Sequence, residues 1–410
     1  MDDSIYRLRN HDILALTTLA LMAIGVIMVQ SASMGVTGKL GFRLTDPGQK
    51  QLIFSGVGCV AFLLVRRFDY ANLAASKKRI LTAPPVWLMV IAMITCAAVL
   101  VPHVGIEKNG ARRWLPLGIT QFQPSELAKW AVVIFLAWWL TYRPVNLDKF
   151  GNFLLTLVPV GMLTLLVVIQ DFGTAALIAV VAISMCLVGR VKLWHLGVVL
   201  PPAMMAGYWF VAHKAYRWKR MVAFTNPYAD PQGEGYHMIQ SLLSYATGGL
   251  GGTGVGGGIQ KLGYLPEDTT DFVFSTLCEE TGFVGALLVI FLYGLILVVA
   301  WQAIKSARDS FGRLLAFGIA AMVGTQAAIN IAVATVSVPT KGLSLPLISA
   351  GGSGLVITCA AMGLLASVLS HVHPEEGDEG KETADIPVSN RPQHKLKNVD
   401  EQAWSEWTTA

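Results

Sequence analysis

The feature that most constrains this chain is a series of long apolar stretches that carry almost no charge. Most of them approach the roughly 20 residues that a helix needs to cross a hydrocarbon core of about 30 Å. Only 14% of the 410 residues are charged and the mean hydropathy is +0.55, which excludes an ordinary soluble domain because its surface would need more charge. We therefore predict an all-α polytopic membrane protein with about ten transmembrane helices, near Ile13–Ser31, Leu52–Leu64, Leu81–Val101, Leu127–Leu140, Phe153–Ile169, Phe172–Val188, Leu193–Val211, Phe272–Trp301, Leu314–Val336 and Gly354–Leu369.

Basic residues in the short loops predict the orientation. The following basic residues lie on one side of the predicted membrane: Arg66, Arg67, Lys77, Lys78, Arg79, Arg143, Lys149, Arg190, Lys192, Lys305, Arg308 and Arg313. The side richer in Lys and Arg faces the cytoplasm. An even number of spans then gives a cytoplasmic N-terminus at residues 1–12, a membrane domain at 13–371 and a cytoplasmic tail at 372–410. The tail is polar and poor in apolar residues, so we expect it to be disordered.

A large extracytoplasmic loop is predicted at residues 212–270, between the seventh and eighth helices. Loops of this length are usually functional or disordered, and its aromatic residues favour packing against the membrane domain. Its glycine-rich stretch, 248–258, lies outside any strand–turn–helix unit, so its likeness to a dinucleotide-binding fingerprint is spurious. Two roles stay open for these glycines: a flexible hinge, or tight folding that exposes backbone N–H groups to an anion.

Asp271 lies where this loop enters the eighth helix, half in water and half against lipid. A carboxylate in that position suits a general base that acts on a membrane-anchored substrate. Two effects on its pKa oppose each other: capping the helix would lower the pKa, and burial beside Phe272 and Phe274 would raise it. The sequence leaves both open. Glu279 and Glu280, deeper in the same helix, are expected to serve helix packing or a water-filled cavity.

Basic residues on the outer side oppose the orientation rule and therefore ask for an anionic ligand. They are Arg112, Arg113, Lys214, Arg217, Lys219, Arg220, Lys261 and Lys341. Glu126 and Lys129 lie three residues apart on one helical face, with Ser125 as a candidate helix cap. A structural ion pair and a direct role in the chemistry are both open for them. Pro and Gly residues at 339–353, around Ser349, break any helix at membrane depth, which is tolerated where backbone lines a cavity or is buried in protein.

Metal-binding patterns are weak in this sequence. The five cysteines fall singly inside predicted spans, and the eight histidines are scattered along the chain. Neither set shows metal-ligand spacing, so the sequence names no metal site. The cysteines are interpreted as small apolar residues rather than as disulfide partners.

The loop and helix-entry motifs, taken in order, resemble those of the SEDS family (shape, elongation, division and sporulation), whose members polymerise peptidoglycan. The matching segments are Gly110 to Trp114, Phe122 to Lys129, Asp171 to Thr174, Arg217 to Arg220, Asp230-Pro231, Gly235-Tyr236, Gln240-Ser241, Gln260 to Leu262, Leu265 to Glu267 and Thr270 to Phe272. The run from Pro339 to Leu343 is similar to the division branch, FtsW, more than to the elongation branch, RodA. Four positions depart from the family pattern without removing its acidic position: Gln170, His237, Thr269 and Ala350.

The resemblance implies a substrate and a mechanism. The substrate is lipid II, and the reaction is an inverting glycosyl transfer that extends a glycan strand and releases polyprenyl diphosphate. Asp271 is implied as the catalytic base, and a divalent cation, Mg or Mn, is the one cofactor candidate, with its ligands unknown. The residues implied to bind substrate, the basic ones at its diphosphate, are Arg113, Glu126, Lys129, Arg217, Lys219, Arg220, Lys341 and Ser349.

The resemblance also implies partners and a location. The expected partners are lipid II, a class B penicillin-binding protein that acts as transpeptidase, other division proteins and the membrane itself, with no nucleic acid. The expected location is the bacterial cytoplasmic membrane, crossed many times, at the division septum. Two other functions stay open: a transporter that flips lipid II, and a non-enzymatic scaffold for division proteins.

Overall fold

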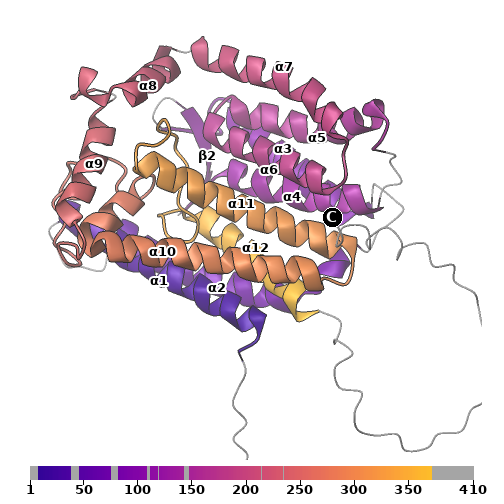
Figure 1. Cartoon of the computed structure of the whole chain (residues 1–410), viewed down its shortest axis with the longest axis horizontal. Coiled ribbons are helices and arrows are strands. Elements are labelled where there is room, and N and C mark those ends of the chain that lie inside the picture. Colours follow the sequence, from indigo (N-terminus) through magenta and orange to yellow (C-terminus); the bar gives the residue numbers. More distant parts are fainter. Residues whose placement is uncertain are drawn as a thin grey trace, which may run out of the picture. The chain divides into compact units, whose positions relative to one another are not determined.

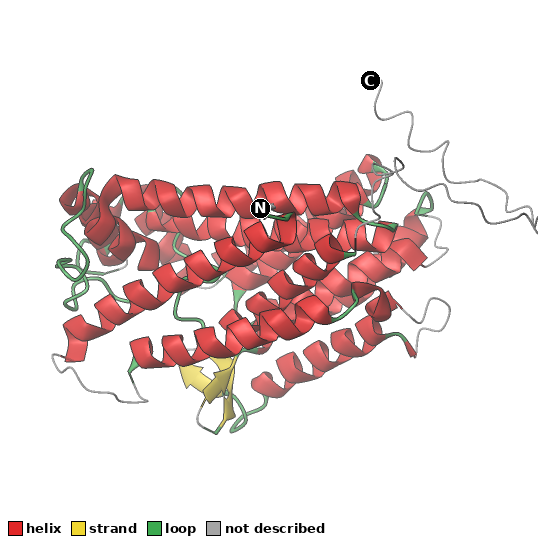
Figure 2. Ribbon diagram, turned by 90° about the horizontal axis from the view of Figure 1, so that it is seen from below, coloured by secondary structure: helices red, strands yellow, loops and turns green. Residues whose placement is uncertain are grey.

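The computed structural model describes residues 8–37, 46–74, 82–108, 111–118, 120–142, 147–213, 215–233 and 235–371. The predicted cytoplasmic tail, 372–410, and most of the N-terminal segment lie outside the described residues. The described chain is mostly helical, with long helices that run in roughly the same direction (Figures 1 and 2). The helices are α1 (Asn10–Thr37), α2 (Pro47–Arg67), α3 (Pro84–Leu100), α4 (Pro124–Tyr142), α5 (Phe150–Val168), α6 (Phe172–Val188), α7 (Leu193–Ala212), α8 (Ala215–Thr225), α9 (Tyr236–Gly248), α10 (Val273–Ser306), α11 (Ser310–Ala334) and α12 (Ser353–Ser370).

Each of the ten apolar stretches coincides with one of these helices. Within the described residues, six helices are long and apolar enough to cross a membrane: α1, α2, α5, α10, α11 and α12. The helices α3 and α6 are apolar but shorter. The chain is therefore a multi-pass helical membrane protein, as the sequence predicts, while the number of ten crossings stays a prediction.

The helices α11 and α12 form the centre of the bundle. In their most apolar windows 61% and 72% of the residues are buried inside the protein, against 28% for α2 and for α5, which present apolar side chains outward. Glycines let the central helices approach closely, because a side chain on Gly363 of α12 would lie 2.6 Å from the backbone oxygen of Phe62 in α2. Small residues at such contacts are typical of helices packed in a membrane.

A small antiparallel sheet follows α3 and departs from the all-α prediction. Its strands are β1 (Ile106–Lys108), β2 (Ala111–Leu117) and β3 (Thr120–Phe122), with β2 in the middle. A turn with Gly118 at a φ of +65° connects β2 to β3. The segment is too short and too rich in turn residues for periodicity to reveal it, and its consequence is to hold Arg113 on a rigid strand.

The predicted extracytoplasmic segment, 212–270, contains helices of its own. After α8 and the 3₁₀ turn Pro227–Ala229, α9 packs against α10, and the glycine-rich stretch then folds back onto α10. The backbone N–H groups of Thr253 and Gly254 donate to the carbonyl groups of Glu279 and Glu280. In Figure 1, α7, α8 and α9 follow one another along the edge of the bundle. The glycines therefore serve close folding rather than a free hinge.

The glycine-rich stretch and the residues directly after it donate backbone hydrogen bonds to two carboxylate side chains of α10. Glu279 accepts hydrogen bonds from the backbone of Ile259 at 2.8 Å and of Gln260 at 3.2 Å, and its side chain is fully buried. Glu280 forms an ion pair of 2.7 Å with Lys261 and accepts a hydrogen bond of 2.7 Å from Ser31 of α1. Lys261 is thus buried and already paired with Glu280. It is therefore not one of the cations that could meet an external anion, contrary to the expectation from the sequence.

The irregular segment between α11 and α12 is buried in protein, as its Pro and Gly content predicts. Its carbonyl groups accept hydrogen bonds from side chains of three helices. Gln326 and Asn330 of α11 donate to Ser344 and Leu343, Tyr293 of α10 donates to Pro346, and Gln51 of α2 donates to Ile348 and Ser349. Non-helical backbone at membrane depth is stable only when its polar groups are paired in this way.

The buried ion pair of Lys261 and Glu280 gives a prediction about stability. Replacing Lys261 with Met leaves the Glu280 carboxylate buried without its cation, which typically costs about 3–5 kcal/mol. The double variant Lys261→Met/Glu280→Gln removes both charges and should recover most of that loss. The measurement is thermal unfolding of the purified protein in detergent, with Lys305→Met at an exposed position as control. A double variant no more stable than the single one would show that the loss does not come from an unpaired Glu280 carboxylate.

Candidate functional site

Asp271 lies one residue before the N-cap of α10 and does not cap that helix. The N-cap residue is Phe272, and no side chain caps it by a hydrogen bond. Burial, helped by the carboxylates of Glu267 and Asp171, raises the pKa of Asp271 from 3.8 to about 7, and Arg113 and Arg220 only partly oppose the rise. Of the two opposing effects that the sequence leaves open, desolvation is therefore the stronger.

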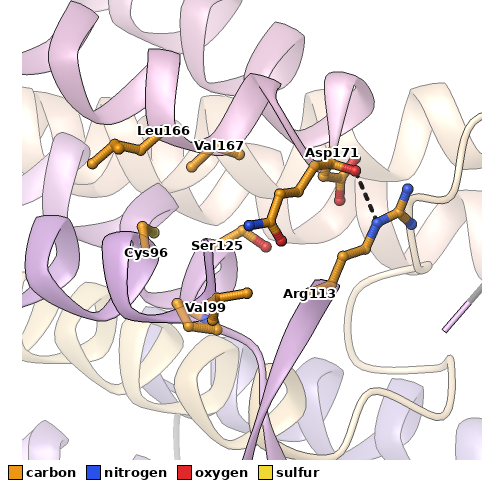
Figure 3. A pocket seen from close by; sticks show the side chains of 9 residues that line it. Cys96, Val99, Arg113, Ser125, Leu166, Val167 and Asp171 are labelled. Carbon is orange, nitrogen blue, oxygen red and sulfur yellow. Dashed lines mark hydrogen bonds between the residues drawn. The ribbon is translucent and has the colours of Figure 1, made fainter. Parts of the chain in front are cut away.

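A glycine lies between the Asp271 carboxylate and the Arg113 guanidinium. A β-carbon placed on Gly342 would lie 3.3 Å from Oδ2 of Asp271 and 3.6 Å from Nη1 of Arg113. Arg113 extends from β2, and its Nε donates a hydrogen bond of 3.0 Å to the carbonyl oxygen of Gln170 (Figure 3). The strand and this bond fix the guanidinium beside the carboxylate.

Asp171 lies close enough to Asp271 to affect its pKa, and it caps α6. Its Oδ1 accepts from the backbone N–H of Thr174 at 3.1 Å, and its Oδ2 accepts from the Thr174 hydroxyl at 2.7 Å. Asp171 and Arg113 lie at the edge of a small, half-open cavity (Figure 3). The remaining lining residues are mostly apolar: Cys96, Val99, Pro124, Ser125, Leu166, Val167 and Gln170. The cavity therefore combines apolar walls with a charged edge.

Lys341 lies on the irregular segment near Asp171. Its Nζ is 5.3 Å from the centre of the Phe172 ring, and burial lowers the pKa of this lysine. A β-carbon on Gly173 would lie 3.4 Å both from Oδ1 of Asp171 and from Cβ of Lys341. A partly desolvated ammonium group of this kind gains most from an anion that enters the site.

The basic residues of α8 divide into different environments. Arg220 is half-buried and close enough to Asp271 to lower the pKa of that carboxyl. Lys219 is exposed, and the side chain of Arg217 lies outside the described residues. The structure thus places Arg113 and Arg220 close to Asp271. Lys341 lies close to Asp171, on the segment whose Gly342 contacts the Asp271 carboxylate, and Lys219 has no place in this group.

Glu126 and Lys129 form the expected ion pair, at 2.9 Å. Lys129 is fully buried and donates a second hydrogen bond of 2.7 Å to Gln326 of α11, so its charge is already matched within the protein. These contacts favour the structural interpretation of the pair. Ser125 is not the helix cap, because α4 begins at Pro124 and Ser125 lies inside its first turn.

Ser349 is buried and acts on the backbone that carries Asp271. Its hydroxyl donates to the carbonyl oxygen of Thr270 at 2.6 Å and accepts from the N–H of Leu345 at 2.7 Å. Both hydroxyl functions are used, which favours support of the site over direct contact with substrate. Asn330 has a similar place and escaped the sequence analysis. The signal that could have revealed it is a pair of amides, Gln326 and Asn330, one helical turn apart in an apolar span.

A resident metal does not fit the described residues. Among them, no group of three or more His, Cys, Asp or Glu side chains is arranged to hold a metal ion. Both carboxylate oxygens of Asp171, which lies beside Arg113, accept hydrogen bonds from Thr174. We therefore derive no chemical step through a protein-bound ion.

The fold and the charged group around Asp271 define a multi-pass membrane protein with its site at the end of a long helix. The chain matches the FtsW, RodA and SpoVE family, described as cell cycle proteins, over residues 12–373. It belongs to this family, which confirms the resemblance carried by its motifs.

Named relatives and solved structures agree with this assignment. The probable peptidoglycan glycosyltransferase FtsW of Trichlorobacter lovleyi is 37% identical over 88% of this chain and 94% of its own length. Stage V sporulation protein E of Bacillus subtilis is 35% identical over 87% of this chain and 96% of its own. RodA of Thermus thermophilus superimposes with a TM-score of 0.63 at 26% identity, covering 88% of this chain and 97% of that one. A chain from a peptidoglycan synthase complex that coordinates polymerization and crosslinking gives a TM-score of 0.68 at 30% identity, over 87% and 96%.

The raised pKa of Asp271 predicts a gain in stability when the charge is removed. The folded protein holds the Asp271 proton more tightly than the unfolded chain does, so wild-type stability falls as pH rises from about 4 to about 7. The shift corresponds to at most about 4 kcal/mol. We expect Asp271→Asn to unfold at higher temperature than wild type at pH 8, with the difference shrinking as pH falls below 7.

The measurement is thermal unfolding in detergent across that pH range. Asp230→Asn, which changes an exposed carboxylate in the segment between α7 and α10, serves as control and should show no such trend. A constant difference between Asp271→Asn and wild type at every pH would mean that Asp271 is not desolvated in the folded protein.

Proposed function

We propose that this protein is a peptidoglycan glycosyltransferase that polymerises lipid II at the outer face of the bacterial cytoplasmic membrane. The observation that carries the proposal is the half-buried Asp271, with a pKa near 7, beside Arg113 and Arg220 and next to the turn that carries Lys341, at the end of a membrane-spanning helix. Relatives over most of the chain are named as such enzymes. Site and family therefore support the same reaction class.

Asp271 acts as the general base in this proposal. A base works best when its pKa lies near the operating pH, and the pKa of about 7 meets that condition. The acceptor hydroxyl loses its proton to Asp271 while its oxygen bonds to the anomeric carbon of the donor. The bond from that carbon to the diphosphate oxygen breaks, the electron pair leaves with the diphosphate, and the configuration at the carbon inverts.

The three cations stabilise the departing diphosphate. Diphosphate is a good leaving group once its charge is matched, so no second carboxyl is needed as an acid. The pKa of Lys341 is lowered by burial, and a bound diphosphate would oppose this effect by stabilising the ammonium group. The shape of the site is supported by Glu126, Lys129 and Ser349. The substrate would meet Lys219 and Arg217 only at its margin.

The small cavity beside Arg113 has the mixed character of such a substrate at the point where lipid and diphosphate join. Val99, Leu166 and Val167 supply apolar walls, and Arg113 and Asp171 supply a polar edge. A lipid-linked diphosphate has the same two halves, a hydrocarbon chain and a polyanion. We propose that a divalent ion, Mg or Mn, arrives with the diphosphate rather than from a protein site.

The proposed partner is a transpeptidase of the class B penicillin-binding proteins, within a group of division proteins at the septum. The support comes from the similar chain in a peptidoglycan synthase complex that coordinates polymerization and crosslinking. The division role is supported by relatives that carry the FtsW name.

Replacing Asp271 with Asn tests the proposed base. The change keeps the shape of the side chain but removes its ability to accept a proton, so we expect polymerisation of lipid II to slow by roughly 10²–10⁴. The wild-type rate should fall on the acid side of about pH 7, where Asp271 is protonated. The assay uses purified full-length protein with lipid II and follows glycan products on gels.

Two results would contradict this assignment. Folded Asp271→Asn protein with a near-normal rate would remove Asp271 from the mechanism. A wild-type protein that moves lipid II across vesicles without polymerising it would support the transporter alternative instead.

Neighbouring arginines on β2 test the proposed contact with diphosphate. Arg113 faces the site, whereas Arg112 points away and pairs with Glu107 at 3.3 Å. A charge-assisted contact contributes about 1.5–3 kcal/mol, which corresponds to roughly tenfold to a hundredfold in lipid II use. We expect a loss of that size for Arg113→Gln and for Arg220→Gln. Arg112→Gln should stay close to wild type, and an equal loss in all three would assign the effect to net charge or folding.

A further inference from the structure

The backbone carbonyl groups of Thr269, Thr270 and Asp271 each accept a hydrogen bond from a residue outside their own segment. The backbone N–H of Ala350 donates to Thr269 at 2.9 Å, and the hydroxyl of Ser349 donates to Thr270 at 2.6 Å. The side-chain amide of Asn330 donates to Asp271 itself at 2.9 Å. The backbone of the base is therefore held residue by residue.

Asn330 differs from the other donors because it holds both sides of the site. The same Nδ2 that donates to Asp271 also donates to the carbonyl oxygen of Leu343 at 2.7 Å. Leu343 follows Gly342, the residue whose missing side chain leaves room between the Asp271 carboxylate and Arg113. One amide thus ties the backbone of the base to the turn against which its carboxylate rests.

The environment of Asn330 makes this link rigid. The residue lies about one turn from the C-terminal end of α11, is 1% exposed and cannot exchange its hydrogen bonds with water. Both amide hydrogens are used, one for each carbonyl group. Movement of Asp271 away from Gly342 would break a buried hydrogen bond on one side or the other.

We propose that Asn330 is a positioning residue for glycosyl transfer, which sets the distance between the Asp271 carboxylate and the turn that carries Lys341 and Gly342. This inference rests on the proposed function. Asn330 touches neither the substrate nor the reacting atoms, and it acts through the backbone of Asp271. Misplacement of a catalytic group by about 1 Å can lower the rate by roughly a hundredfold.

The test compares Asn330→Leu with Tyr293→Phe in the full-length protein in detergent. Leu has the same branching as Asn and is somewhat bulkier, but it donates no hydrogen bond, so it leaves both carbonyl groups without their donor. Tyr293 of α10 also holds the irregular segment, through the carbonyl oxygen of Pro346, but this bond does not reach Asp271. Each variant therefore loosens the segment, and only Asn330→Leu loosens the base.

We expect Asn330→Leu to lower kcat for polymerisation by about a hundredfold, with the Kd for fluorescent lipid II changed by less than about threefold. Tyr293→Phe should keep kcat within about threefold of wild type, even if it loses thermal stability. Hydrogen exchange should speed up around residues 268–275 in Asn330→Leu only. Equal losses of kcat in the two variants, or loss of lipid II binding as the main effect, would overturn the proposal.

A conservative variant covers the case in which Asn330→Leu does not fold. Asn330→Gln keeps both donors on an arm longer by one methylene, so it should preserve folding while displacing the base, and we expect kcat to fall about tenfold. Unchanged kcat would overturn the positioning role. Hydrogen exchange does not depend on activity, so a wild-type protein that fails to polymerise lipid II would refute the proposed function, whereas unchanged exchange near Asp271 would refute this inference alone.

Discussion

Backbone that leaves the helical path at membrane depth has to find its hydrogen bonds inside the protein, and this requirement organises the described structure. Water is scarce there, and each unpaired buried carbonyl or amide group is costly. The segment between α11 and α12 meets the requirement with side chains from α2, α10 and α11. The segment before α10 meets it with Ser349 and Asn330. The polar residues of the bundle are therefore used mainly to satisfy backbone near the site.

The same requirement shapes the electrostatics of the site. Asp271 lies in backbone that is enclosed on several sides, which removes water from its carboxylate and raises its pKa to about 7. Glu279 and Glu280, in α10, receive hydrogen bonds from backbone N–H groups, and Glu280 also pairs with Lys261. Two kinds of carboxylate thus lie close together in the chain: Asp271, with its pKa near 7, and two glutamates whose oxygens are bonded to fixed partners. Pairs of acids with such different environments are typical of functional sites.

Much of the fold could be predicted from the sequence because apolar periodicity and length fix where helices lie in a membrane. The ten stretches all coincide with helices, and the broken backbone at 339–353 was indicated by its Pro and Gly residues. The sheet that holds Arg113 could not be predicted, because three short strands carry little pattern. The balance of effects on Asp271 could not be predicted either, since it depends on Gly342, Arg113 and Asp171, which come from distant parts of the chain. The pairing of Lys261 with Glu280 could not be predicted either, because it depends on how the glycine-rich stretch folds back onto α10.

The break in α10 at Gly282 has a consequence for the distance between the site and the lipid-exposed part of that helix. This residue has a φ of +68°, and α10 is covered by protein from Val273 to Glu280, whereas Phe283 and Val284 are 54% and 67% exposed. The helix after the break, 283–306, is about 36 Å long at 1.5 Å per residue, which is enough to span the hydrocarbon core by itself. The part before the break adds about 15 Å of helix, enclosed by protein, between Asp271 and the lipid-exposed part of α10. A sugar joined to lipid through a diphosphate would lie at a comparable distance from its lipid chain, so the enclosed part of the helix acts as a spacer between the anchor of the substrate and the atom that reacts.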